Sequence, residues 1–308
     1  MVMVEASKLT KVYSGNTVVD SLNLKIDEGQ LFGFLGPNGA GKTTTILMLL
    51  GLTNPTSGTA SIGGFNSTRE ALKVKRISGY IPEKVGFYND LTAKANLMYT
   101  ANLNGIFGEE AEKGIAKAIE DVGLKEKKDE YVSSFSKGMK QRLAIADILV
   151  KQPRVAFLDE PTTGIDPEGI IQILDLIGKI AKDNNMTVIM SSHQLSQVQR
   201  ICSHVGIMSK GKLIAEGSLE QLGRKAGGGK VLIEVQLAEI TQDIADAIKS
   251  IRGVLSVERV ENTLNITCSE DLRRQISKVI SDKNGLIIQM KLQSYGLEDI
   301  YMKITRGA

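Results

Sequence analysis

The chain has 308 residues, more than one ordinary domain and fewer than three, so we expect one large domain with a smaller companion. Hydrophobic residues make up 42% and charged residues 24%, values typical of a globular protein, which excludes a disordered or fibrous chain. Aromatic residues make up only 5%, tryptophan is absent and the net charge is +3. This composition argues against a surface built to stack bases or to neutralise a nucleic-acid backbone.

The sequence shows no sign of membrane insertion or export. The longest apolar run, residues 46–52, is much shorter than the roughly 18 residues needed to span a bilayer. Glu5, Lys8 and Lys11 stand where a secretory signal would be apolar, so we expect a cytoplasmic protein. Cys202 and Cys268 lack metal-ligand spacing and are interpreted as small buried residues.

In the first part of the chain, strand-like apolar runs alternate with helix-length segments, as in a sheet flanked by helices. Strands are expected over 30–35, 77–82, 155–158 and 187–191. The last two are continuous apolar runs, typical of strands buried on both faces, which favours a mostly parallel sheet. After residue 92 the strand pattern lapses, and a helical insertion is expected, with helices over 92–104, 109–122 and 138–151.

The composition changes toward the C-terminus. All six prolines precede residue 168, and the glycines at 227–229 are typical of a domain boundary. Beyond them we expect, in order, a strand over 230–237, a helix over 241–251, strands over 254–260 and 263–267, a helix over 271–282, and a strand over 286–293. This β-α-β-β-α-β order is ferredoxin-like, with Glu261-Asn262 as a hairpin turn. A last helix is expected over 297–305, and the core is expected to contain Leu232, Val235, Ile244, Ile248, Ile276 and Ile280.

One glycine-rich segment fits the pattern G-x-x-x-x-G-K-[ST], between an apolar strand and a helix expected over 42–50. In such a loop the backbone N–H groups turn toward phosphate oxygens, Lys42 reaches the β- and γ-phosphates, and Thr43 ligates Mg²⁺. The alternative is an ordinary glycine-rich turn, and a P-loop alone leaves kinases, GTPases and ATPases open. The expected nucleotide contacts are Gly36, Pro37, Asn38, Gly39, Ala40, Gly41, Lys42, Thr43 and Thr44.

Two carboxylates follow the apolar strand over 155–158, at the edge of the sheet where ligands of open α/β folds bind. Asp159 is placed to hold Mg²⁺ through water, and Glu160 to accept a proton from an attacking water. Hydrolysis needs such a base, whereas a kinase needs a second substrate, so the pair favours an ATPase. The alternative is two solvated acids at a strand end.

A further motif, Ser136-Lys137-Gly138-Met139, lies at the start of a helix with Ser136 as a natural N-cap. With this motif the chain, from about Val4 to about Leu222, resembles the ATP-binding subunit of an ATP-binding cassette (ABC) transporter. The resemblance implies that two subunits face head to tail, and that Ser136 and Gly138 close on the γ-phosphate bound by the partner's P-loop. It also implies a separate polytopic membrane permease as partner, without nucleic acid.

The same resemblance implies roles for three further residues. Tyr13 stands where the family stacks an aromatic ring on adenine, and Asp166 lies in the loop that crosses to the partner subunit. His193 matches the histidine that contacts the γ-phosphate and helps hold Glu160 and water in line. The alternatives are a core tyrosine and a structural histidine.

The chain departs from the family pattern at several positions. Glu83 replaces the glutamine whose side chain meets Mg²⁺ and water, and we expect the carboxylate to keep that role. Phe135, Lys137 and Met139 replace the family's Leu, Gly and Gln, whereas the pair that faces phosphate is retained. Variants of this form with a C-terminal appendage resemble exporter ATPases encoded apart from their permeases.

The sequence therefore predicts an α/β P-loop cassette with a mostly parallel central sheet, an antiparallel β subdomain and a helical insertion. The expected domains are a cassette over 1–222 with its helical subdomain at about 84–151, a linker over 223–229, and an α+β regulatory or dimerisation domain over 230–308. The predicted function is hydrolysis of Mg·ATP by a homodimer that drives a permease, through residues 83–91, at the cytoplasmic face of the membrane. The alternative is a soluble cassette ATPase acting on nucleic acid or the ribosome.

Overall fold

The structure is a computed structural model that describes residues 1–226, 230–293 and 301–302. It divides into two compact units, residues 1–216 and 217–308. The glycines at 227–229 and most of the helix expected over 297–305 lie outside the described residues. Residues 223–226, expected to be linker, belong to the helix α8 (Leu219–Ala226). None of the described helices combines the length and the apolar character that a membrane span requires.

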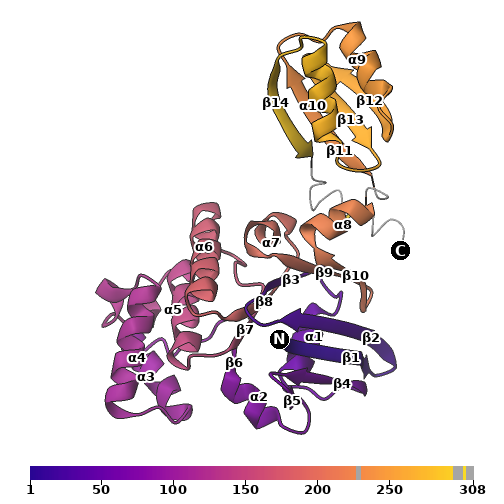
Figure 1. The fold of residues 1–308 in the computed structure, drawn as a ribbon. Helices are drawn as coiled ribbons and strands as arrows, with labels where there is room; N and C mark the ends of the chain where they lie inside the picture. The colour runs from indigo at the N-terminus through magenta and orange to yellow at the C-terminus, as the bar shows by residue number, and fades with distance from the viewer. Residues whose placement is uncertain (227–229, 294–300, 303–308) are drawn as a thin grey trace. The chain divides into compact units, whose positions relative to one another are not determined.

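The central sheet of the first unit has six strands in the order β10-β9-β3-β8-β7-β6, and all pairings from β9 to β6 are parallel. Every residue of β7 and β8 is buried, which confirms the prediction from their continuous apolar runs. Figure 1 shows these strands at the middle of the unit. The strands are β3 (Leu31–Leu35), β6 (Ser78–Ile81), β7 (Val155–Asp159), β8 (Thr187–Ser192), β9 (His204–Ser209) and β10 (Lys212–Ser218).

A second sheet, with order β2-β1-β4-β5, is antiparallel and was not located strand by strand from the sequence. Its strands are β1 (Val2–Tyr13), β2 (Asn16–Asp27), β4 (Ser57–Ile62) and β5 (Phe65–Asn66). The helix α1 (Lys42–Leu49) follows β3, and α2 (Ala71–Ile77) leads into β6. One buried cluster joins this sheet to the central sheet, with Leu9, Ile26, Phe32, Ile46 and Phe157 among its members.

The helical insertion lies between β6 and β7, as the sequence predicted. It contains α3 (Ala93–Leu103), α4 (Gly108–Asp121), two short 3-10 turns at Lys125–Lys127 and Val132–Ser134, and α5 (Lys137–Val150). Thr92 caps α3 by accepting a hydrogen bond from the backbone N–H of Ala95 at 3.1 Å. Figure 1 shows α3, α4 and α5 gathered on one side of the unit, whereas α6 (Pro167–Asp183) and α7 (Leu195–Ile201) lie beside the central strands.

From β11 onward the second unit has the predicted β-α-β-β-α-β order, and its sheet order β12-β13-β11-β14 is that of a ferredoxin-like fold. One core prediction was wrong: Leu232 is only half-buried, whereas its neighbour Ile233 is buried with the other five predicted positions. Successive residues of a strand face opposite sides, so the core side of β11 carries 233, 235 and 237. The elements are β11 (Val231–Leu237), α9 (Gln242–Lys249), β12 (Val254–Val260), β13 (Thr263–Cys268), α10 (Arg273–Asp282) and β14 (Ile287–Gln293).

Candidate active site

Backbone carbonyl groups of other segments pack closely against the glycine-rich loop between β3 and α1. A Cβ atom at Gly36 would lie 2.4 Å from the carbonyl oxygen of Met208, and one at Gly41 would lie 2.7 Å from that of Val18. Both positions therefore require glycine, and the loop can follow its curved path only with these residues. Lys42 is buried within the curve, where its Nζ donates to the carbonyl oxygens of Gly36 at 2.7 Å and Pro37 at 3.2 Å.

The two carboxylates at the end of β7 are held by the neighbouring strand β8. Asp159 is 1% exposed and accepts a hydrogen bond from the Ser191 hydroxyl. The same hydroxyl oxygen accepts from the backbone N–H of Glu160 at 3.0 Å. Burial raises the pKa of the nearby Tyr80 phenol to about 12, and the negative charge of Asp159 adds to the shift. Ser191 therefore fixes both acidic residues relative to β8.

Glu160 lies between two polar partners. Its Oε2 is 2.9 Å from Nδ1 of His193, and its Oε1 is 3.5 Å from Nζ of Lys42. Because an ionised carboxylate only accepts hydrogen bonds, Nδ1 of His193 carries the proton of this bond. Oε1 is buried and makes no hydrogen bond in the structure. This oxygen is therefore an acceptor that can take a proton from a bound donor.

Lys42, Glu160 and His193 line a cavity of about 440 Å³ at the carboxyl ends of the central strands. Gly39 faces open space, with nothing within 4 Å of the position its Cβ would take. A cradle of glycine backbone with one buried lysine fits the phosphates of a nucleotide, and the hydroxyl and carboxylate oxygens beside it fit Mg²⁺. The lining residues are Val18, Asn38, Gly39, Ala40, Gly41, Lys42, Thr43, Thr44, Glu83, Glu160, Thr163 and His193.

The fold brings some of the expected site residues together and leaves others apart. Glu83, Glu160 and His193 come from three different loops to the same cavity. The expected site residues that do not line it are Tyr13, Gly36, Pro37, Ser136, Gly138, Asp159 and Asp166. Tyr13 ends β1 with the Nζ of Lys11 4.8 Å from its ring centre. Ser136 caps α5, as predicted, and Asp166 caps α6.

Val18 and Thr163 line the cavity but were not singled out from the sequence. The signal for Val18 would have been the hairpin that contains β2, which was not predicted from the sequence. Thr163 lies three residues after Glu160, in the turn closed by its own N–H bond to the Glu160 carbonyl oxygen at 3.1 Å. Its position shortly after Glu160 is the sequence feature from which a place in the cavity could have been predicted.

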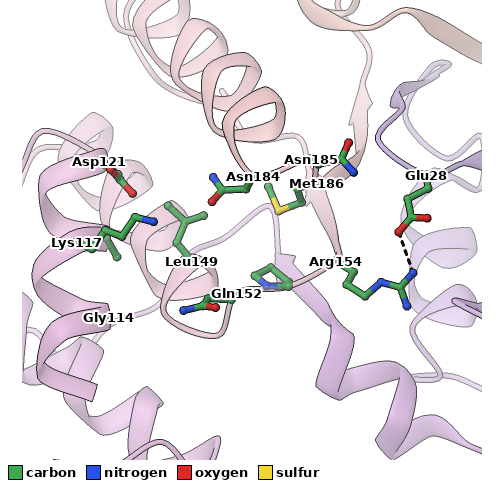
Figure 2. Close-up of a pocket in the computed structure, with 12 residues that line it drawn as sticks. Glu28, Gly114, Lys117, Asp121, Leu149, Gln152, Arg154, Asn184, Asn185 and Met186 are labelled. Carbon is green, nitrogen blue, oxygen red and sulfur yellow. Dashed lines mark hydrogen bonds and ion pairs between the residues drawn. The ribbon is translucent and has the colours of Figure 1, made fainter. Parts of the chain in front are cut away.

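A second cavity, of about 410 Å³, lies at the opposite, amino ends of the central strands (Figure 2). It is lined by residues just before β7 and β8, by Glu28 of the turn between β2 and β3, by Leu149 near the end of α5, and by α4. Glu28 and Arg154 form an ion pair at 2.8 Å. Figure 2 shows this pair at one edge of the cavity and Lys117 and Asp121 on α4. No glycine cradle faces this second cavity, whereas the glycine-rich loop lines the first.

A P-loop, a buried strand ending in Asp-Glu and a histidine bonded to that glutamate together define a P-loop ATPase. The comparisons with known proteins give its family. A family model described as "ABC transporter" matches residues 19–163. Over 307 residues the chain is 37% identical to the bacitracin transport ATP-binding protein BcrA of Bacillus licheniformis, covering 99% of this chain and 98% of that protein.

Two further comparisons agree. The chain is 32% identical over 308 residues to the linearmycin resistance ATP-binding protein LnrL of Bacillus subtilis, covering 98% of each protein. A solved structure of the ATP-binding subunit of an ABC transporter superposes with a TM-score of 0.66 at 29% identity, covering 73% of this chain and 93% of that one. The chain belongs to the ABC transporter ATP-binding proteins, and it is an ATPase that powers transport. None of these names points to nucleic acid or the ribosome, the predicted alternative.

Proposed function

We propose that two copies of this chain drive a separate membrane permease that exports antibiotic-like compounds, and that they work at the cytoplasmic face of the membrane. The relatives named for bacitracin transport and linearmycin resistance support this substrate class. The arrangement that carries the proposal is the carboxylate of Glu160, held between Lys42 and His193 in the phosphate cavity.

In this proposal residues 36–44 hold the triphosphate of ATP. The loop contributes backbone N–H groups and the N-terminus of α1, and Lys42 turns from the carbonyl oxygens it now contacts to the β- and γ-phosphates. Thr43 and Glu83, which line the cavity, and Asp159, the buried residue before Glu160, offer the hydroxyl and carboxylate oxygens that would hold Mg²⁺. When bound, Mg²⁺ neutralises charge on the phosphate oxygens.

Glu160 is the proposed general base. Oε1 accepts a proton from water, the water oxygen bonds to the γ-phosphorus, and the bond to the β-phosphate oxygen breaks to give ADP and phosphate. His193 holds the carboxylate through Nδ1, and its Nε2 would donate a hydrogen bond to the γ-phosphate when the ring carries a proton on both nitrogens. The buried position of Lys42 keeps a positive charge near the attacked phosphate.

The proposal assigns the remaining site residues to the closed dimer. Ser136 and Gly138 stand at the N-terminus of α5, where unpaired N–H groups favour an anion, and would meet the γ-phosphate held by the partner copy. Asp166 would lie against that partner, and Tyr13, which is 45% exposed, would stack on adenine. The C-terminal unit is proposed to support dimerisation or regulation.

An exposed aromatic patch on the helical insertion supports a permease contact. Tyr88 and Tyr99 pack edge to face with ring centres 5.2 Å apart, and both rings are about half exposed. Leu103 and Phe107 add exposed apolar surface on the same insertion. Exposed aromatic and apolar side chains of this kind are typical of a docking surface, and Tyr88 belongs to the proposed coupling segment 83–91.

The Glu160→Gln variant tests the proposed function. The amide cannot accept the proton from water, so turnover should fall by at least about 10²-fold. ATP should still bind, because the P-loop and Lys42 are unchanged, and it should accumulate a dimer that size-exclusion chromatography separates from the monomer. A variant that remains monomeric with Mg·ATP would contradict dimer closure, and unchanged turnover would contradict the role of Glu160.

A further inference from the structure

A buried side-chain network lies behind the Glu160–His193 pair and is centred on Gln197 of α7. Gln197 is 4% exposed. Its Oε1 accepts hydrogen bonds from the Thr162 hydroxyl at 2.6 Å and the Ser192 hydroxyl at 3.2 Å. Its Nε2 donates to Oε1 of Gln194 at 2.7 Å. One carboxamide thus joins three side chains from two separate loops.

The two loops are those that carry the reacting groups. Thr162 follows Glu160 by two residues, in a turn closed by the bond from the Ile165 N–H to the Thr162 carbonyl oxygen at 3.2 Å. Ser192 and Gln194 stand on either side of His193 in the chain, and the Gln194 N–H donates to the Ser192 hydroxyl at 2.9 Å. The amide of Gln197 therefore links a side chain that follows Glu160 to the side chains on both sides of His193.

Packing alone does not require a polar side chain at this position. The neighbouring Val198 is fully buried and contributes the apolar contact of α7 with β3, where its methyl groups face Gly33. An amide buried here must instead satisfy its own donors and acceptors, and the network does so with directional bonds. Directional bonds fix the relative positions of two loops, which an apolar side chain in the same space would not do.

We propose that Gln197 is a positioning residue for ATP hydrolysis, which sets the geometry of Glu160 relative to His193. The inference rests on the proposed roles of those two residues. Gln197 does not line the phosphate cavity, so it acts through Thr162 and through the two residues that flank His193. Binding of ATP depends on the P-loop and Lys42, which the network does not contact, so loss of the network should lower kcat and leave KM nearly unchanged.

The test compares Gln197→Met with Gln199→Met in the full chain. Methionine fills the space of the amide but forms none of its three bonds, whereas Gln199 is exposed on the same helix. We expect kcat of Gln197→Met to fall about 10²-fold, the size of effect that misplacement of a catalytic group produces, with KM for ATP within about threefold. Gln199→Met should match the wild type, and wild-type kcat in Gln197→Met would overturn the proposal.

A second variant, Thr162→Val, removes one hydroxyl and preserves shape. If Gln197 acts through Thr162, the two substitutions combined should lower kcat little more than Gln197→Met alone. If the two substitutions instead lower kcat by independent factors that multiply, Gln197 does not act through Thr162 and this part of the proposal is wrong. Thermal unfolding checks that each variant folds, and Thr162→Val carries the test if Gln197→Met does not. Equal loss of kcat with a parallel rise in KM would indicate a general packing defect and would contradict the proposal.

The Glu160→Gln variant distinguishes a failure of the proposed function from a failure of the positioning role of Gln197 alone. If that variant keeps its turnover, the proposed function fails and this inference fails with it. If Glu160→Gln abolishes turnover while Gln197→Met and Thr162→Val retain wild-type kcat, the proposed function stands and only the positioning role of Gln197 is wrong.

Discussion

The backbone of Glu160 is held in an uncommon conformation, with φ 48°, in the left-handed region that non-glycine residues seldom adopt. Such a conformation costs on the order of 1 kcal/mol or more and persists where surrounding bonds fix it. Here the Glu160 N–H donates to both the hydroxyl and the carbonyl oxygen of Ser191. The turn directs the carboxylate away from the strand and toward Lys42 and His193. The adjacent acids could be predicted from sequence, but this turn depends on β8 and could not.

Glu83 adds a negative charge to the cavity where the family pattern has an amide. In Glu83→Gln that charge is removed, and an amide oxygen attracts Mg²⁺ less strongly than a carboxylate does. We expect the Mg²⁺ concentration at half-maximal ATPase rate to rise about threefold to tenfold. A magnesium titration of the rate measures this, with Glu110→Gln, an exposed change on α4, as control. An unchanged titration would show that the extra charge has no part in metal binding.

Ionisation of Asp147 on α5 makes the stability of the fold depend on pH. Burial raises the pKa of this carboxyl from 3.8 to about 6, although a hydrogen bond to Thr100 and the charge of Lys151 oppose the shift. Because the folded-state pKa is the higher one, the stabilising effect is complete below about pH 4 and is lost as the pH rises through about 6. The ionised form is therefore a cost to folding at neutral pH.

The Asp147→Asn variant should remove that cost. A shift of about two pKa units corresponds to at most about 3 kcal/mol, so we expect the variant to be the more stable protein at pH 8 and to lose this advantage near pH 4. Urea unfolding at both pH values measures the difference. Asp121→Asn, an exposed change on α4, should give the same small difference at both. A pH-independent difference for Asp147→Asn would contradict the assignment.

At the level of elements, prediction succeeded where a local pattern decides the structure. The helices of the insertion begin within a residue or two of the predicted positions, because caps such as Thr92 and Ser136 mark them. The hairpin of β1 and β2 was not located, because its pairing shifts register at several points and Lys8 and Ser21 have positive φ. Bulges of this kind break the alternation from which a strand is predicted. The meeting of Glu83, Glu160 and His193 depends on strand order, which no local pattern contains.

At the N-terminus of α5, a comparison of Ser136 with Thr92 distinguishes helix capping from phosphate binding. The hydroxyl of Ser136 accepts from the Met139 N–H at 3.2 Å, and Thr92 makes the same kind of cap on α3. Replacing either residue by alanine should cost about 1 kcal/mol of stability. Only Ser136→Ala should also lower the ATPase rate of the dimer, because only this cap is proposed to meet phosphate. Thermal unfolding and steady-state kinetics of both variants measure this, and equal rates would contradict the role of Ser136.

The two units of the molecule each have a buried apolar cluster. That of the second unit includes Ile233, Val235, Ile244, Leu264 and Ile276 among its members. Length and the glycine-rich boundary indicated two domains, but the helix α8 continues to Ala226 and leaves less linker than expected. The function of the second unit does not follow from its ferredoxin-like fold, since that fold serves many roles.

A chain that ends at Gly229 lacks β11 to β14, the ferredoxin-like part of the second unit, and tests the proposed role of that part. The first unit has its own buried cluster and contains the whole phosphate cavity, so this shorter chain should fold and bind ATP. If the second unit supports dimerisation, the shorter Glu160→Gln chain should need at least about tenfold more protein to form the ATP-dependent dimer, a cost of roughly 1.4 kcal/mol. Sedimentation of both chains across a concentration series measures this. Equal dimer affinity with an altered ATPase rate would instead assign the second unit to regulation, because its removal would then act on turnover without weakening the dimer.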